Sequence, residues 1–171
     1  MAFKIYIACK MTGRDKLEMN KRAEYVCKTL QEYGLTPISP VLEEKVEAKE
    51  GKLINNDKER LQGFWKRDKE IIAKEAHVVL MDHAEMKSFG MEREYGYNRF
   101  CLWKPTVIMV PPNTPLSVAQ FEDDAFYYSV HHAAQEIARL WGTRTRRWIW
   151  RIKMLNRALP SWIYLQLLAW R

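Results

Sequence analysis

The sequence predicts an α/β protein, with a mainly parallel sheet of four to five strands between two layers of helices. Short apolar runs alternate with amphipathic or charged segments of helical length, in four successive strand–helix units. The 171 residues are 47% hydrophobic and 29% charged, which is enough apolar sequence for one domain with a substantial core.

The first two strands enclose an amphipathic helix. "FKIYIA" (3–8) is β-branched and aromatic, which is typical of a buried strand. Residues 17–33 carry apolar side chains at helical spacing, namely Ala23, Val26, Cys27 and Leu30. Gly34 is suited to end that helix, and "LTPISP" (35–40) then forms a short strand that stops at Pro40.

The next part begins with a highly charged segment, residues 43–63. It favours a solvated connection, either an exposed helix or a mobile loop, over a lid on a binding site. Residues 64–76 then predict a helix. "HVVLMD" (77–82) is a continuous apolar run and predicts a strand that is buried on both faces.

A further helix is expected over residues 91–102, opening near Glu92 and Glu94, before the strand "TVIMVP". Ser117 and Gln120 have the spacing of a capping box for a long helix that runs to about Leu140. The whole pattern predicts a flavodoxin- or Rossmann-like three-layer sandwich. Ligands bind such sheets beyond the carboxyl ends of the strands, which here are the loops at 9–16, 83–90 and 111–117.

The basic character of the chain is concentrated at its C-terminus. Residues 139–171 hold eight Arg and Lys, no Asp or Glu, and five of the seven Trp, whereas residues 1–138 hold 20 basic and 21 acidic residues. We therefore expect one domain at 1–140 and a separate basic, Trp- and Arg-rich helical tail at 141–171, divided by Pro160. The tail could pack on its own domain or on a second subunit, lie in a membrane surface, or bind nucleic acid.

The composition indicates a cytoplasmic protein with free thiols. Cys9, Cys27 and Cys101 are odd in number and lack metal-ligand spacing, and the N-terminus lacks the pattern of a signal peptide. No apolar run is long enough to cross a bilayer. His131 and His132 are adjacent and so point to different faces of a helix, and we expect neither a metal nor an organic cofactor.

Two loops hold residues suited to chemistry. After the first strand, the cations of Lys10, Arg14 and Lys16 with Gly13 could bind a phosphate, although a simple turn explains them as well. After the third strand, Glu94 follows Ser88 and Gly90 near the start of a helix, where the helix N-terminus would favour its ionised form.

With Asp68, Glu94 could form the carboxylate pair of a glycosidic-bond-cleaving enzyme, and both could equally be ordinary helix-start acids. The neighbouring Tyr95 either packs in the core or contacts a base or a second subunit.

These motifs resemble the nucleoside 2-deoxyribosyltransferase-like superfamily, which includes 2′-deoxynucleoside 5′-monophosphate N-hydrolases. The resemblance covers residues 3–112 and is closest to small phage and bacterial members. It rests on "KIYIACKMTG" with Asn20, on "GLTPISP", on "RDKEIIAKEAH", and on the spacing of Ser88, Gly90 and Glu94. It implies that Glu94 attacks C1′ of the sugar, Asp68 protonates the departing base, and Tyr6 orients Glu94.

The resemblance also implies that the substrate is a nucleotide or nucleoside and that the protein is a homodimer or higher homo-oligomer. Ser88 and Gly90 would contact a 5′-phosphate, together with the loop after the first strand, made of Lys10, Met11, Thr12, Gly13 and Arg14. A serine at position 88 favours a nucleotide because a hydroxyl donates to phosphate where a carboxylate would repel it.

The sequence departs from the superfamily pattern at Cys9-Lys10, at His77 and in the position of Asp68, so Glu92 or Asp82 could replace Asp68 as the acid. The expected activity is cleavage of the N-glycosidic bond of a (2′-deoxy)nucleoside 5′-monophosphate. The alternatives are transfer of the sugar to a second base, or a non-catalytic nucleotide-binding module that its tail brings to a membrane or to nucleic acid.

Overall fold

The protein is described here from a computed structural model. The described residues are 3–9, 15–43, 58–83, 89–102, 104–110, 125–127 and 129–141. The chain divides into two units, Met1–Gln135 and Glu136–Arg171, and the sheet belongs to the first.

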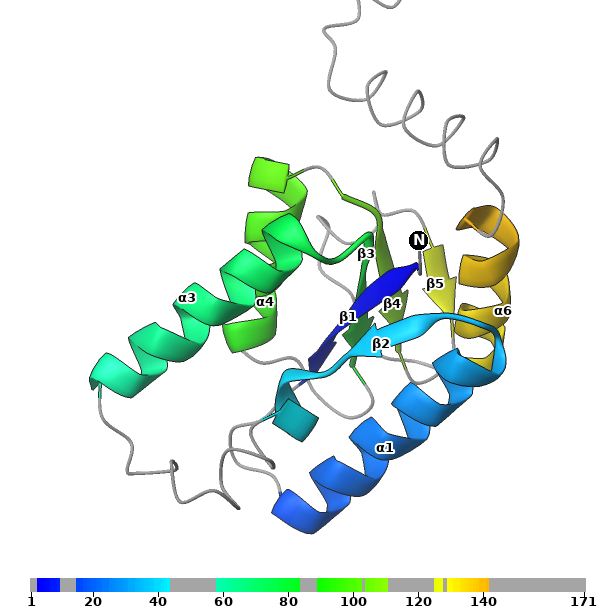
Figure 1. Ribbon diagram of the computed structural model, residues 1–171, viewed down its shortest axis with the longest axis horizontal. Coiled ribbons are helices and arrows are strands. Elements are labelled where there is room, and N and C mark those ends of the chain that lie inside the picture. Colours follow the sequence, from blue (N-terminus) through cyan, green and yellow to red (C-terminus); the bar gives the residue numbers. More distant parts are fainter. Residues whose placement is uncertain are drawn as a thin grey trace, which may run out of the picture. The chain divides into compact units, whose positions relative to one another are not determined.

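The elements follow the predicted alternation of strands and helices (Figure 1). The strands are β1 (Lys4–Cys9), β2 (Thr36–Ile38), β3 (Val78–Asp82), β4 (Thr106–Met109) and β5 (Ala125–Tyr127). The helices are α1 (Lys16–Glu32), α3 (Lys58–Lys74), α4 (Phe89–Tyr97), the π-helical η1 (Asn98–Leu102) and α6 (Val130–Trp141).

The five strands form one sheet in the order β2-β1-β3-β4-β5, and every pair is parallel. This is the flavodoxin-like order, and it confirms the predicted fold class. The order reverses between β1 and β3, whose last residues, Cys9 and Asp82, are paired in the register. Folds of this kind bind their ligands outside the carboxyl ends of the strands at such a reversal.

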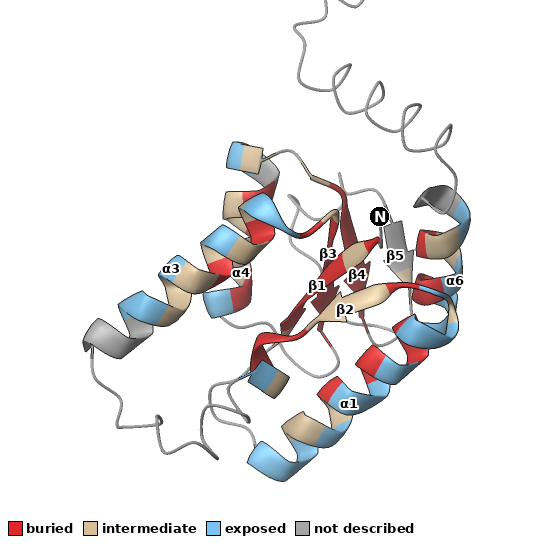
Figure 2. Ribbon diagram, viewed as in Figure 1, coloured by how far each residue is buried: buried red, intermediate tan, exposed pale blue. Residues whose placement is uncertain are grey.

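Helices cover both faces of the sheet (Figure 1). α3 and α4 cover the face toward which β1 directs Tyr6 and Ala8 and β3 directs Val79 and Met81, and these residues form one buried cluster. Because side chains alternate along a strand, the neighbouring residues of β1 and β3 point to the opposite face, which α1 covers. Figure 2 shows the strands β1 and β3 almost wholly buried, as predicted for the run at 77–82.

α1 begins and ends as its sequence predicts. The Asp15 side chain accepts hydrogen bonds from the backbone N–H groups of Leu17 (2.8 Å) and Glu18 (3.0 Å) and so caps the N-terminus. Gly34 follows the helix with a φ of 72°, a left-handed conformation that favours glycine. The predicted apolar positions are buried, namely Ala23, Val26, Cys27 and Leu30.

The prediction of one long helix over residues 117–140 is wrong. Ala125–Tyr127 forms β5 along the edge of β4, and α6 begins only at Val130. A strand here supplies β4 with backbone hydrogen-bond partners on its second side, which a helix would not do. Ser129 starts the helix instead, since its hydroxyl accepts from the His132 N–H at 3.1 Å. Ser117 and Gln120 lie outside the described residues.

Two other boundaries differ from the sequence prediction. α3 begins at Lys58, six residues before the predicted start at Phe64, so part of the charged segment is helical. Residues 44–57 of that segment lie outside the description. The helix predicted over 91–102 begins at Phe89 and changes to π-helical geometry at Asn98. π-helical turns often occur near functional sites.

Lys104 connects the end of α3 to the segment after α4. Its ammonium group donates three hydrogen bonds, of 2.6 to 2.7 Å, to the carbonyls of Ile72, Ala73 and Ala76. These carbonyls lack helical partners because α3 ends there. The buried Asn98 side chain in turn donates to the Lys104 carbonyl (2.9 Å) and to the Thr106 hydroxyl (2.8 Å). α3, η1 and β4 are therefore fixed to one another at this end.

Candidate active site

A contact between a buried tyrosine and a partly buried glutamate lies on the α3/α4 face. Tyr6 is fully buried in the middle of β1, and its hydroxyl donates to Oε1 of Glu94 at 2.9 Å. Burial and then the nearby negative charge of Glu94 raise the pKa of Tyr6 well above its ordinary value. The phenol therefore stays protonated at neutral pH and acts as a donor to Glu94.

Glu94 is the sixth residue of α4 and is held by β1 rather than by the helix terminus. Burial, followed by the charge of Asp68, raises the pKa of Glu94 to about 8, while the Tyr6 hydrogen bond and Arg67 oppose the rise. The expectation that the helix N-terminus keeps this carboxyl ionised is therefore wrong. The first turn of α4 holds Glu92 instead, and the dipole effect fades within one turn.

Asp68 of α3 supplies the second carboxyl group. Its side chain is buried, and burial raises its pKa above the ordinary value, while the Arg67 guanidinium opposes part of that rise. Arg67 donates from Nε (3.2 Å) and Nη2 (3.1 Å), and both hydrogen bonds go to the same oxygen, Oδ1. No role for Arg67 was predicted from the sequence, although its position beside Asp68 indicates that the acid has a cationic neighbour.

The predicted phosphate-binding residues lie mostly outside the description. Gly90 stands in the first turn of α4 and is exposed. Ser88 and the loop that contains Lys10, Met11, Thr12, Gly13 and Arg14 are not among the described residues. Their predicted contacts remain predictions.

Asp82, one of the alternative acids, belongs to the opposite face of the sheet. It accepts from Arg22 of α1 through both carboxylate oxygens, with Nε to Oδ2 at 2.9 Å and Nη2 to Oδ1 at 3.1 Å. Only 2% of the Asp82 side chain is exposed, and both of its carboxylate oxygens accept from Arg22. The other alternative, Glu92, has no hydrogen bond to Tyr6, which contacts Glu94.

The aromatic residues beside Glu94 have structural contacts. Tyr95 is buried in the core cluster, in agreement with one of its two predicted roles. Tyr97 meets Trp65 of α3 edge-on, with ring centroids 5.9 Å apart, and Lys69 and Arg93 lie over the Trp65 ring at 5.4 and 4.4 Å. This group packs α4 against α3 and so helps to set the separation of Glu94 from Asp68.

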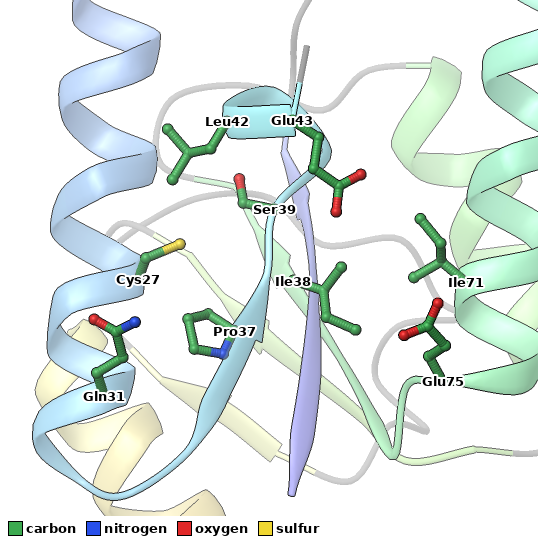
Figure 3. A pocket seen from close by; sticks show the side chains of 9 residues that line it. All are labelled: Cys27, Gln31, Pro37, Ile38, Ser39, Leu42, Glu43, Ile71 and Glu75. Atoms are coloured by element: carbon green, nitrogen blue, oxygen red, sulfur yellow. The ribbon is translucent and has the colours of Figure 1, made fainter. Parts of the chain in front are cut away.

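A groove of about 390 Å³ lies apart from these residues, along β2 between α1 and α3 (Figure 3). It is lined by Cys27, Gln31, Pro37, Ile38, Ser39, Leu42, Glu43, Ile71 and Glu75. Burial raises the pKa of its Cys27 thiol to about 11, so that thiol is protonated and a poor nucleophile at neutral pH. The groove has two carboxyls of its own, Glu43 and Glu75, but none of the residues Tyr6, Asp68 and Glu94 lines it.

The described part of the chain holds no group of three or more His, Cys, Asp or Glu side chains that could bind a metal ion. Among the described helices, none has both the length and the apolar character needed to cross a membrane.

The fold resembles that of a known enzyme. No family model matches the chain, and no curated protein matches its sequence. Among solved structures, the 2-deoxyribosyltransferase of the psychrotolerant bacterium Bacillus psychrosaccharolyticus is similar, with a TM-score of 0.59 and 21% sequence identity. The match covers 77% of this chain and 90% of the enzyme, which is described as a biocatalyst for nucleoside synthesis. The chain therefore has the fold of a 2-deoxyribosyltransferase, as its motifs predicted.

Proposed function

We propose that the protein cleaves the N-glycosidic bond of a (2′-deoxy)nucleoside 5′-monophosphate through a covalent bond between the sugar and Glu94. The observation that carries the proposal is the 2.9 Å hydrogen bond from Tyr6 to Glu94, together with a second carboxyl, the buried Asp68, whose charge acts on Glu94. The sequence resemblance assigns these three residues to the reaction, and they belong to β1, α3 and α4.

The reaction needs one carboxylate and one carboxylic acid. The Glu94 carboxylate attacks C1′, the bond from C1′ to the base nitrogen breaks, and its electron pair leaves with the base. Asp68 gives a proton to that base. Water then attacks C1′ while Asp68 takes a proton from it, and the bond between Glu94 and the sugar breaks. Tyr6 fixes the orientation of Glu94 throughout.

A 5′-phosphate would bind at the carboxyl ends of β1 and β3. The loops that carry Lys10, Arg14 and Ser88 continue from Cys9 and from the segment after Asp82, which are neighbours in the sheet register. Cationic and hydroxyl groups suit a nucleotide better than an uncharged nucleoside.

The second candidate is transfer of the sugar to another base, which the similarity to a 2-deoxyribosyltransferase favours. Both reactions share the same covalent intermediate. They differ in whether water or an incoming base resolves it, so the second substrate decides between them.

A direct test is chromatography of the free base released from a panel of deoxy- and ribonucleosides and their monophosphates. Wild type is compared with Glu94→Ala and with Glu70→Ala, a control that removes an exposed carboxylate from α3. We expect base release by wild type and Glu70→Ala, and a loss of at least about 10³-fold in Glu94→Ala. A second base added to the mixture then separates transfer from hydrolysis. Release that survives in Glu94→Ala, or tight nucleotide binding without any release, would contradict the proposal and favour another reaction or a binding module.

A further inference from the structure

The two carboxyl groups of the candidate site have unlike partners. Asp68 accepts two charge-assisted hydrogen bonds from the guanidinium of Arg67, at 3.1 and 3.2 Å. Glu94 accepts one hydrogen bond, at 2.9 Å, from the neutral hydroxyl of Tyr6. A cation stabilises an ionised carboxylate far more than a neutral donor does.

The groups that act on this pair come from two elements. The charged and titratable side chains that affect Glu94 are Tyr6 of β1 and Arg67 and Asp68 of α3, and Arg67 is the one that affects Asp68. Among the described residues, Arg67 is thus the cation that acts on both carboxyls. Its guanidinium also lies over the Phe64 ring, 5.1 Å from the ring centroid, which limits its orientation.

We propose that Arg67 is a positioning residue that decides which carboxyl carries the proton: in the unliganded protein it holds Asp68 as the anion and leaves the proton on Glu94. This inference rests on the proposed function, because it concerns the same two carboxyls. The raised pKa of Glu94 agrees with it. The negative charge of Asp68 acts on Glu94, and two such carboxyls favour sharing one proton, since ionising both brings like charges together.

The resting arrangement is the reverse of the one that cleavage requires. A nucleophilic Glu94 must be ionised, and an Asp68 that protonates the base must carry the proton. Transfer of one proton from Glu94 to Asp68 makes this exchange without changing the net charge of the pair. A hydrogen-bond acceptor on the bound nucleobase that draws Arg67 away from Oδ1 of Asp68 would favour the transfer. Arg67 thereby keeps Glu94 unreactive until a base occupies the site.

The order in which the two carboxyls ionise tests the inference without any turnover. We would follow the carboxyl carbons of ¹³C-labelled protein by NMR across pH, and assign Asp68 and Glu94 from Asp68→Asn and Glu94→Gln. In wild type, Asp68 should ionise first and Glu94 last. In Arg67→Gln both carboxyls lose the cation, but Asp68 also loses its two hydrogen bonds. Its midpoint should therefore rise past that of Glu94, which keeps its Tyr6 hydrogen bond and should ionise first.

Lys66→Gln is the matched control, because it removes the same charge from an exposed position of the same helix and should leave the order unchanged. Arg67→Lys keeps a cation and should also keep the wild-type order, which makes the experiment independent of how well Arg67→Gln folds. An unchanged order in Arg67→Gln, or a reversed order in Arg67→Lys or Lys66→Gln, would overturn the inference. A reversed order in Arg67→Gln together with no base release from any substrate would leave this inference standing and defeat the proposed function instead.

Discussion

Among the described residues, each face of the sheet carries one arginine–aspartate pair, and the two pairs are built differently. Arg22 and Asp82 on the α1 face use both carboxylate oxygens, and Asp82 is almost completely enclosed. Arg67 and Asp68 on the α3/α4 face use one oxygen only, and 12% of the Asp68 side chain is exposed. The first arrangement saturates the carboxylate and fixes α1 to β3. The second leaves Oδ2 of Asp68 available to a reactant, as an acid or base requires.

Breaking the saturated pair should have the largest effect on stability. Asp82→Asn leaves Arg22 half-buried without its counter-charge, which should lower the free energy of unfolding by about 3–5 kcal/mol. Denaturant unfolding measures the change. Glu75→Gln removes the acid of an exposed pair with Lys4 and should cost less than about 1 kcal/mol. Equal losses of stability in the two variants would mean that the Arg22–Asp82 pair does not fix α1 to β3.

Removing the Lys104 ammonium group, which contacts the end of α3, should have the second largest effect on stability. Lys104→Met withdraws the donor from three backbone carbonyls, with an expected loss of about 2–3 kcal/mol in unfolding free energy. Lys74→Met is the matched control, because Lys74 lies in the last turn of the same helix and reaches only the exposed Glu70, at 4.0 Å. Because α3 also carries Asp68, we expect base release to fall in Lys104→Met and not in Lys74→Met.

Glu94→Gln should stabilise the fold at alkaline pH while it removes activity. Because the pKa of Glu94 is raised to about 8 in the folded protein, the carboxyl favours folding fully below its ordinary pKa, and this contribution is lost as pH rises through about 8. The variant lacks that loss, so its stability advantage should grow from pH 5 to 9 and reach on the order of 2 kcal/mol. Thermal unfolding at several pH values checks this, and an advantage that does not change with pH would be the contrary result.

The smallest expected effect tests the coupling within the reactive pair. Asp68→Asn removes the negative charge that helps to raise the pKa of Glu94, so the Glu94 midpoint should fall by about one pH unit. NMR titration of the Glu94 carboxyl measures the shift. Asp82→Asn, on the other face of the sheet, should leave that midpoint unchanged. If the Glu94 midpoint is the same in wild type and in Asp68→Asn, the two carboxyls do not act as a pair.

The parts of this molecule that sequence predicted well are those set by local pattern. The continuous apolar run at 77–82 gave β3, and the spacing of Ala23, Val26 and Leu30 with Gly34 gave α1 and its end. The three residues of the candidate site were named from a motif resemblance; the structure joins two of them, Tyr6 and Glu94, by a hydrogen bond, and the catalytic roles stay predictions. Short apolar segments gave weaker signals, so Ala125–Tyr127 was included in a helix when it forms β5.

The parts that sequence missed depend on distant packing. Nothing local indicates that Lys104 reaches the end of α3, or that Arg22 reaches Asp82 sixty residues later. The predicted direction of the Glu94 pKa shift was wrong for the same reason. A helix start can be recognised in a sequence, whereas the depth at which a carboxyl is buried, and the charge of Asp68 beside it, emerge only when α3, α4 and β1 pack together.

The proline in β2 limits how another chain can approach this edge of the sheet. The Thr36 N–H donates to the Phe3 carbonyl, so the next residue, Pro37, directs its nitrogen away from β1. A proline nitrogen has no hydrogen to donate. An incoming peptide strand would therefore find no donor at the middle of this three-residue edge, which disfavours strand addition and the sheet-to-sheet aggregation that follows from it. Any partner of the groove beside β2 would have to be recognised by side chains rather than by an added strand.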